Sequence, residues 1–327
     1  MEYKPLGSTG VKVSQLCFGT MSFGGDADED TSSAIFKKCR DAGINFFDCA
    51  NGYAGGRSEE ILGRLIAGSR QDLVITSKAY FPMGTDINAR GASRRNLLAS
   101  IEASLKRLNT DHLDVFFIHH FDDQTPLIET LRALDDLVQT GKILYPAASN
   151  FAAWQVMKAL GISAAQGWSP FAVLQPMYNL VKRQAEVEIL PMALSEGLGV
   201  IPYSPLGGGL LSGKYAPGLR PESGRLVENQ MYQVRYGADE VYAVAGRFTE
   251  FARQRGFDPA ALAVAWVGSH PAVTAPIIGA RSLTQLAGTL KSVDIPMTAE
   301  LRAEISALST EPPLATDRSE ETSPRSI

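Results

Sequence analysis

Four side chains suited to acid–base chemistry lie close behind short apolar runs of the sequence. Asp48, Lys78 and His119 each come directly after such a run, and Tyr53 lies five residues past Asp48. Each has an ordinary alternative explanation, since an aspartate can cap a loop, a lysine stem can lie along apolar surface, and a histidine can be a satisfied core residue. An acid, a lysine, a histidine and a tyrosine in this pattern together predict a catalytic site.

The four residue types fit the reduction of a carbonyl group. A tyrosine has a pKa of about 10 and is a weak acid at neutral pH, but a neighbouring ammonium group stabilises its phenolate and lowers that pKa. Asp48 would keep Lys78 charged and oriented, and His119 could hold a substrate oxygen. The set then provides a proton donor beside a place where alkoxide charge can develop. No side chain supplies hydride, so a cofactor is implied.

Short apolar runs alternate with longer segments of helical period, which predicts parallel strands joined by helices. The predicted strands cover residues 45–47, 73–76, 113–118, 171–174 and 199–201, with weaker candidates at 16–18, 143–145 and 276–278. Leucines at helical spacing predict helices near 97–108 and 127–138, and Gly43 and Gly141 are expected to end two helices before the next strand. Pro146 is an awkward residue for a central strand.

Eight strand–helix units predict a single-domain α/β protein, a (β/α)8 TIM barrel over residues 1–310 with long loops on its C-terminal face. An open doubly wound sheet is the alternative. In a barrel, polar residues at the C-terminal strand ends line the active site, so the four candidates would meet there. Residues 207–237 contain no predicted strand and are expected to form a functional or disordered loop. Residues 311–327 have the composition of a polar, disordered tail.

Three other motifs are incomplete. Residues 208–214 nearly form a phosphate-binding P-loop, but Tyr215 stands where Ser or Thr must bind Mg²⁺. Tyr178 and Lys182 have the spacing found in short-chain dehydrogenases, which also need an N-terminal Gly-rich turn that this chain lacks. The four histidines and three cysteines show no metal-ligand spacing. We therefore expect neither a nucleotide triphosphatase nor a metal site.

The chain resembles the aldo-keto reductases from about residue 3 to 310, with motifs in the family's order. The first motif is Phe47-Asp48-Cys49-Ala50-x-x-Tyr53 with Gly56-Arg57-Ser58-Glu59, and others lie at 76–78, 114–119, 141–143, 149–151, 175–179, 203–206, 213–215 and 278–281. The resemblance implies a (β/α)8 barrel that binds an extended nicotinamide cofactor. It also implies NADPH-dependent reduction of an aldehyde or ketone, sugar carbonyls included, by a catalytic tetrad of Asp48, Tyr53, Lys78 and His119, with Tyr53 as proton donor.

The resemblance further implies a set of cofactor contacts. These are Gly19, Thr20 and Met21 on the first loop, Asp48, the carboxamide-binding Ser149, Asn150 and Gln175, the stacking Tyr203, the pyrophosphate-loop residues Ser204, Leu206, Gly208 and Lys214, and Gly279, Arg281, Gln285 and Thr289 at the adenosine end. Arg281 favours NADPH over NADH because a guanidinium pairs with a phosphate in a bidentate fork. Thr289 stands where many relatives carry an asparagine, and Cys49 replaces the usual threonine.

The substrate itself stays open at this stage. The expected pocket walls are Phe23, Tyr80, His120 and Phe121, with Phe81, Tyr232 and Tyr236 as further candidates. An aromatic pocket with added polar groups suits small aldehydes, ketones and sugar carbonyls equally well, and the fold does not choose among them.

A second class of function is a cofactor-binding subunit of a membrane channel, in which NADPH occupancy matters more than turnover. The complete tetrad favours an enzyme. Hydrophobic residues make up 45% of the 327 residues and charged residues 20%, with a net charge of −4, so we expect a globular protein without nucleic-acid or membrane partners. The start of the chain lacks signal-peptide order, and the scattered, odd-numbered cysteines suit a reducing compartment, so a cytoplasmic location is expected. Whether it is a monomer or a homo-oligomer is undecided.

Overall fold

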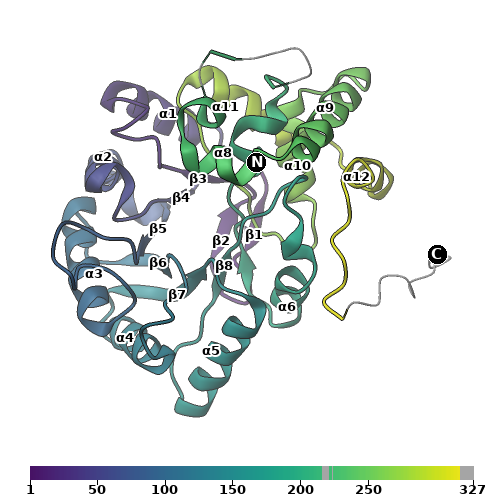
Figure 1. Cartoon of the computed structure of the whole chain (residues 1–327). Coiled ribbons are helices and arrows are strands. Elements are labelled where there is room, and N and C mark those ends of the chain that lie inside the picture. The colour runs from purple at the N-terminus through teal and green to yellow at the C-terminus, as the bar shows by residue number, and fades with distance from the viewer. Residues whose placement is uncertain (216–220, 223, 317–327) are drawn as a thin grey trace.

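Eight parallel strands form one curled sheet in the order β10-β3-β4-β5-β6-β7-β8-β9 in the computed structural model, which describes residues 1–215, 221–222 and 224–316 (Figure 1). The strands are β3 (Cys17–Gly19), β4 (Phe46–Asp48), β5 (Val74–Ala79), β6 (Leu113–Ile118), β7 (Ile143–Ser149), β8 (Val173–Gln175), β9 (Gly199–Val200) and β10 (Ile277–Ile278). The Ile277 N–H donates to the Pro202 carbonyl at 2.9 Å, joining β10 to the end of β9. The sheet thus closes, and the predicted (β/α)8 barrel is confirmed.

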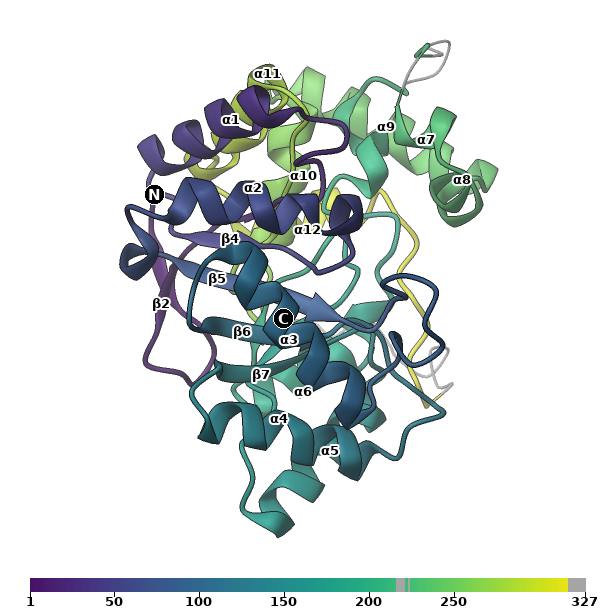
Figure 2. The ribbon, with the colours of Figure 1, turned by 90° about the vertical axis from the view of Figure 1, so that its left-hand side faces the viewer.

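Helices cover the outside of the barrel (Figures 1 and 2). They are α1 (Glu29–Asp41), α2 (Arg57–Ile66), α3 (Arg94–Leu108), α4 (Leu127–Gln139), α5 (Ala153–Gln166), α6 (Ile189–Ser195), α7 (Arg225–Glu228), α8 (Gln230–Tyr236), α9 (Asp239–Gln254), α10 (Pro259–Gly268), α11 (Leu283–Leu290) and α12 (Ala299–Ser306). Gly43 and Gly141 lie one residue past the C-caps of α1 and α4 with φ values of 86° and 70°, as expected of helix-ending glycines. None of the helices in the described part of the chain is both long and apolar enough to cross a membrane.

Two expectations need correction, and a third is only partly covered by the described residues. Pro146 lies within β7, where its carbonyl accepts from the Ala172 N–H, one residue before β8 begins. Pro146 has no N–H to donate, but at this position the hydrogen bonds between β7 and β8 have not yet begun, so no such bond is lost. The segment 207–237 is not a plain loop, because it contains a 3₁₀ helix at Gly207–Ser212 followed by α7 and α8. Residues 311–316 form neither helix nor strand, and the remainder of the predicted tail, 317–327, lies outside the described residues.

The barrel interior decides which side chains reach the active-site end. Inward-facing Phe46, Val74 and Phe117 belong to one buried cluster, together with Leu6 and Val13 from the hairpin of β1 (Tyr3–Pro5) and β2 (Lys12–Ser14). Figure 2 shows β2 at one end of the barrel and α7 and α8 at the other. Strand side chains alternate between faces, so residues an even number of positions beyond the inward ones also point inward.

This alternation applies to three of the candidates. Asp48 is two residues past Phe46, Lys78 four past Val74, and His119 two past Phe117. All three therefore project into the C-terminal end of the barrel, above its apolar interior.

Candidate active site

A cavity of about 830 Å³ opens at the C-terminal end of the barrel, within the size range of ligand and cofactor sites. Its lining includes Gly19, Met21, Asp48, Tyr53, His119, Ser149, Asn150, Gln175, Tyr203, Ser204, Leu206, Gly208, Lys214, Gly279, Arg281, Gln285 and Thr289. Of the predicted catalytic and cofactor residues, Thr20 and Lys78 are missing from the lining. Both are buried beneath the cavity, where each makes a hydrogen bond to Asp48. The structure therefore brings the predicted residues together.

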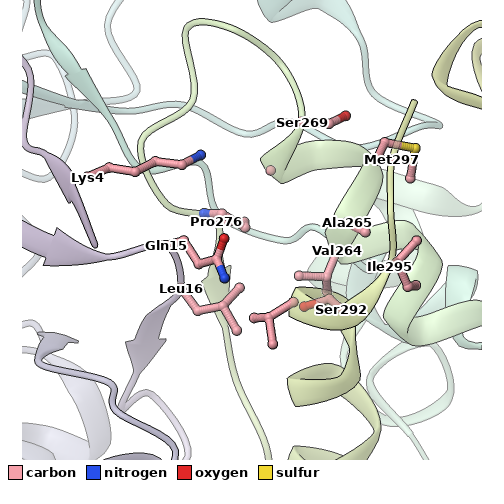
Figure 3. Close-up of a pocket in the computed structure, with 12 residues that line it drawn as sticks. Lys4, Gln15, Leu16, Val264, Ala265, Ser269, Pro276, Ser292, Ile295 and Met297 are labelled. Atoms are coloured by element: carbon pink, nitrogen blue, oxygen red, sulfur yellow. The ribbon is translucent and has the colours of Figure 1, made fainter. Parts of the chain in front are cut away.

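A smaller hollow of about 140 Å³ lies at the opposite end of the barrel. Figure 3 shows Lys4 and Gln15 on one side of it, facing Val264, Ser292 and Ile295 on the other. Lys4 is the one ionisable side chain among its lining residues. Without an acid beside it, this hollow offers no acid–base pair, and the larger cavity is the candidate active site.

Lys78 and Asp48 form a buried ion pair under the cavity floor. The Lys78 Nζ lies 2.6 Å from Asp48 Oδ2 and donates to the Cys49 carbonyl at 2.7 Å. The other carboxylate oxygen, Oδ1, accepts from Thr76 Oγ1 at 2.7 Å and from Gln175 Nε2 at 3.0 Å. Burial is the largest single effect and would lower the pKa of Lys78, but the charge and hydrogen bond of Asp48, together with Tyr53 and Cys49, outweigh it and hold that pKa above its usual value. The lysine is therefore a permanent cation.

Tyr53 presents its hydroxyl to this pair. Its oxygen is 3.4 Å from Lys78 Nζ, and its backbone begins a tight turn, Tyr53–Gly56, in which Ala54 has a φ of 48°. Burial raises the pKa of Tyr53 to about 12, although Lys78 acts to lower it. The ammonium group therefore acts in the expected direction, but burial is the larger effect and the pKa of Tyr53 stays above its ordinary value. The phenol is fully protonated at neutral pH and holds the proton it would donate.

His119 contributes a neutral imidazole. Its ring lies edge-on to Tyr53, with ring centroids 6.1 Å apart, and edge-on to Phe81 at 4.9 Å. Burial lowers the pKa of His119 to about 3, and the positive charges of Lys78 and of a protonated His120 act in the same direction. Near pH 7 the ring therefore carries one N–H donor and one acceptor, and it can donate a hydrogen bond to a substrate oxygen without losing a proton.

The neutral state of His119 predicts a pH-dependent stability. Its pKa is about 3 in the folded protein against an ordinary 6.5, so the unfolded chain binds the extra proton first as the pH falls. We expect the free energy of unfolding to drop between pH 7 and pH 5 by about 1–2 kcal/mol more in the wild type than in His119→Gln. Urea denaturation of both proteins at both pH values measures this. Equal drops would show that His119 is not held neutral.

Amide and hydroxyl groups form the floor beside Tyr53. Asn150, with a φ of 57°, donates from Nδ2 to the His119 carbonyl at 2.9 Å and accepts from the Tyr203 hydroxyl at 2.8 Å. Ser149 Oγ donates to the Gln175 carbonyl at 3.0 Å. These side chains are fixed by one another, and they border the cavity with donors and acceptors of the kind that match a carboxamide.

The far end of the cavity is cationic and glycine-lined. Burial lowers the pKa of Lys214, and the charges of Arg281 and Arg225 lower it further. Gly208 has a φ of 69°, and a Cβ there would lie 2.7 Å from the Tyr232 ring, so no side chain fits in this turn. Cations that repel one another around an open glycine turn suit a polyanion such as a nucleotide phosphate.

Of the four expected pocket walls, one borders the cavity. His120 lies in its lining, as does Phe81, whereas Phe23 is buried in the core against Phe18, with ring centroids 5.7 Å apart. Tyr80 packs behind His120, and Phe121 packs against Phe151 and the exposed Trp154. Phe23, Tyr80 and Phe121 are thus corrected to packing positions around the cavity.

Several walls that were not predicted from the sequence come from α7 and α8. Met231, Arg225 and Arg235 border the cavity, and Tyr232 lies between them as expected. The signal that could have found them is the spacing of Met231 and Arg235, four residues apart on one helix.

Cys49 faces away from the cavity, with its sulfur 3.3 Å from Ser58 Oγ, so its departure from the usual threonine leaves the walls unchanged.

Comparison with known proteins adds a family match. Residues 15–310 match the family model described as the Aldo/keto reductase family. The chain is 38% identical to the "Uncharacterized oxidoreductase YrpG" of Bacillus subtilis (strain 168), covering 92% of this chain and 94% of that protein. It is 37% identical to a "Probable voltage-gated potassium channel subunit beta" of Arabidopsis thaliana (90% and 92%) and 33% identical to the "L-glyceraldehyde 3-phosphate reductase" of Escherichia coli (strain K12) (90% and 88%).

Proposed function

The chain belongs to the aldo/keto reductase family, and from this premise we propose that it reduces an aldehyde or ketone to the alcohol with NADPH as the hydride donor. The observation that carries the proposal is the Tyr53 hydroxyl at the cavity wall, 3.4 Å from the ammonium of a buried Lys78–Asp48 pair. A neutral acid whose conjugate base has a fixed cation beside it is suited to protonating a developing alkoxide.

The cavity also fits the cofactor. Asn150, Ser149 and Gln175 offer carboxamide partners at one end, and Lys214 and Arg281 offer phosphate partners at the other, beside the open turn at Gly208. When bound, a nicotinamide cofactor supplies the hydride that no side chain of the protein can provide.

The chain's own residues perform the proton chemistry. Tyr53 donates its phenolic proton to the substrate oxygen as charge develops there. Lys78 stabilises the phenolate that remains, and Asp48 keeps Lys78 charged and in place. The neutral His119 donates a hydrogen bond to the same oxygen and orients the carbonyl between the two groups.

The direct test is the oxidation of NADPH in the presence of 4-nitrobenzaldehyde, followed by absorbance. We expect steady turnover. Bound NADPH without turnover of this or other activated aldehydes would contradict the proposal.

A second candidate function is that of a cofactor-binding subunit, because relatives named as probable potassium channel beta subunits are 37% identical over 90% of this chain. The complete Tyr53–Lys78–Asp48 arrangement favours turnover. Tight NADPH binding together with the absence of aldehyde reduction would favour the subunit instead.

Arg281 is expected to set the preference for NADPH. Its guanidinium is half-buried at the cationic end, 3.1 Å from Asp26 and 3.6 Å from Glu228. A 2′-phosphate at this position would exchange those carboxylates for a stronger, bidentate partner. Arg281→Met should raise the Kd for NADPH about 10- to 100-fold, consistent with about 1.5–3 kcal/mol for a charged hydrogen bond, and change the Kd for NADH by less than about threefold.

Fluorescence titration with each cofactor measures both constants. Asp26→Asn is the matched control, since it removes a competitor of the phosphate and should leave NADPH binding equal or tighter. An equal loss of affinity for NADPH and NADH in Arg281→Met would contradict the assignment.

A further inference from the structure

The helix α8 places one arginine in the wall of the cavity. Met231 and Arg235 lie one helical turn apart on α8, and both line the cavity. Figure 2 shows α8 at the end of the barrel opposite β2. Neither residue belongs to the tetrad, the amide floor or the phosphate end described above.

Arg235 has no carboxylate partner within the described ranges 1–215, 221–222 and 224–316. Whereas Arg281 is paired with Asp26 and Glu228, Arg235 makes no ion pair and no side-chain hydrogen bond among the residues that the structure describes. Its guanidinium carbon lies 5.5 Å from the centroid of the Tyr232 ring, which holds it against the wall. A guanidinium that is partly removed from water and has no carboxylate partner is a ready site for an anion.

Two arginines contact the same Tyr232 ring but act electrostatically on different residues of the cavity lining. Arg225 lies 5.4 Å from the ring centroid and, with Arg281, is one of the cations that lower the pKa of Lys214 at the phosphate end. Arg235 instead opposes the rise that burial causes in the pKa of Tyr203. Tyr203 lines the same cavity as Arg235 and is hydrogen-bonded to Asn150 of the amide floor.

Other parts of the same cavity are lined by apolar and aromatic groups. Phe81 packs edge-on against His119, and Met231 extends from α8 into the same cavity. These groups suit the carbon skeleton of a small substrate. Arg235 could then bind a negatively charged group on that substrate.

We propose that Arg235 binds an anionic group of the substrate, so that this chain prefers carbonyl compounds that also carry a carboxylate or a phosphate. The inference rests on the proposed reductase function and adds a substrate class to it. Arg235 is then a specificity residue, and its contribution lies in substrate binding more than in the chemical step.

Matched substrate pairs test the proposal and separate its two anion sources. The first pair is 4-carboxybenzaldehyde and methyl 4-formylbenzoate, which differ in the charge of the carboxyl group. The second is glyceraldehyde 3-phosphate and glyceraldehyde. With saturating NADPH, we expect the wild type to prefer the charged member of at least one pair, and the pair that shows the preference identifies the anion.

In Arg235→Met, kcat/KM for the preferred anionic substrate should fall about 10- to 100-fold, mostly through KM, while kcat/KM for its neutral partner changes by less than about threefold. Arg235→Lys should retain part of the preference because it keeps the charge. Arg225→Met is the matched control: it removes the other arginine from the same ring and should weaken NADPH binding without changing the ratio between charged and neutral substrates.

Three outcomes would overturn the inference. One is a wild type that reduces both members of each pair equally well, which leaves the reductase function standing. Another is an Arg235→Met variant whose main defect is a higher Kd for NADPH, which would assign Arg235 to the cofactor. The third is no turnover of any of the four aldehydes: turnover of 4-nitrobenzaldehyde would then leave the reductase function standing, and its absence would overturn that function as well.

Discussion

Replacing Tyr53 with phenylalanine will lower kcat for 4-nitrobenzaldehyde by about two to four orders of magnitude and change the Kd for NADPH by less than about threefold. The hydroxyl removed is the one that lies 3.4 Å from Lys78 Nζ, and its pKa of about 12 means that it carries its proton throughout the neutral range. The aromatic ring stays, so the packing against His119 is preserved. Steady-state kinetics and cofactor titration of the variant measure both effects.

Tyr3→Phe is the matched control. It removes a phenolic hydroxyl that donates to the Gly43 carbonyl at the other end of the barrel, far from the cavity, and it should retain full activity. If Tyr53→Phe turned over at the wild-type rate, another group would have to supply the proton, and the assignment of Tyr53 would be wrong.

Replacing Lys78 with methionine is expected to affect both activity and stability. The lysine is fully buried and Asp48 is 2% exposed, so the substitution leaves a buried carboxylate with neutral donors only. Removing one partner of a buried ion pair costs about 3–5 kcal/mol of unfolding free energy. We also expect kcat to fall by at least about two orders of magnitude, because the phenolate of Tyr53 loses the cation that stabilises it. Urea denaturation and steady-state kinetics measure the two losses.

The double variant Lys78→Met/Asp48→Asn separates these two effects. Removing the unpaired charge as well should restore most of the lost stability, because a neutral amide costs far less to bury than a carboxylate. Activity should stay at the level of Lys78→Met. Wild-type stability of Lys78→Met would show that the unpaired Asp48 carboxylate is not buried. Recovered activity in the double variant would show that Lys78 has no catalytic role.

The sequence by itself determined the barrel and the meeting of its strand-end side chains. Parallel strands joined by helices bring their C-terminal ends to one face, and the two-residue alternation along a strand points Asp48, Lys78 and His119 inward once Phe46, Val74 and Phe117 do. Both rules depend only on a residue's position relative to its neighbours along the chain, so they can be applied to the sequence alone. The predicted cofactor contacts follow the same rule where they lie on strand ends, as Ser149 and Gln175 do.

Only the tertiary structure decided which side chains wall the substrate region and how the acid groups titrate. Phe23 and Met231 are both apolar residues outside the strands. The spacing of Met231 and Arg235 puts them on one helix face, but no periodicity says which surface that face meets or that Phe23 packs into the core. Lys78 lowers the pKa of Tyr53, as its chemistry requires. Burial raises the same pKa by a larger amount, so the net pKa lies above its ordinary value. Both outcomes depend on how much water distant segments exclude, and that quantity exists only after the barrel, its loops and α8 have packed together.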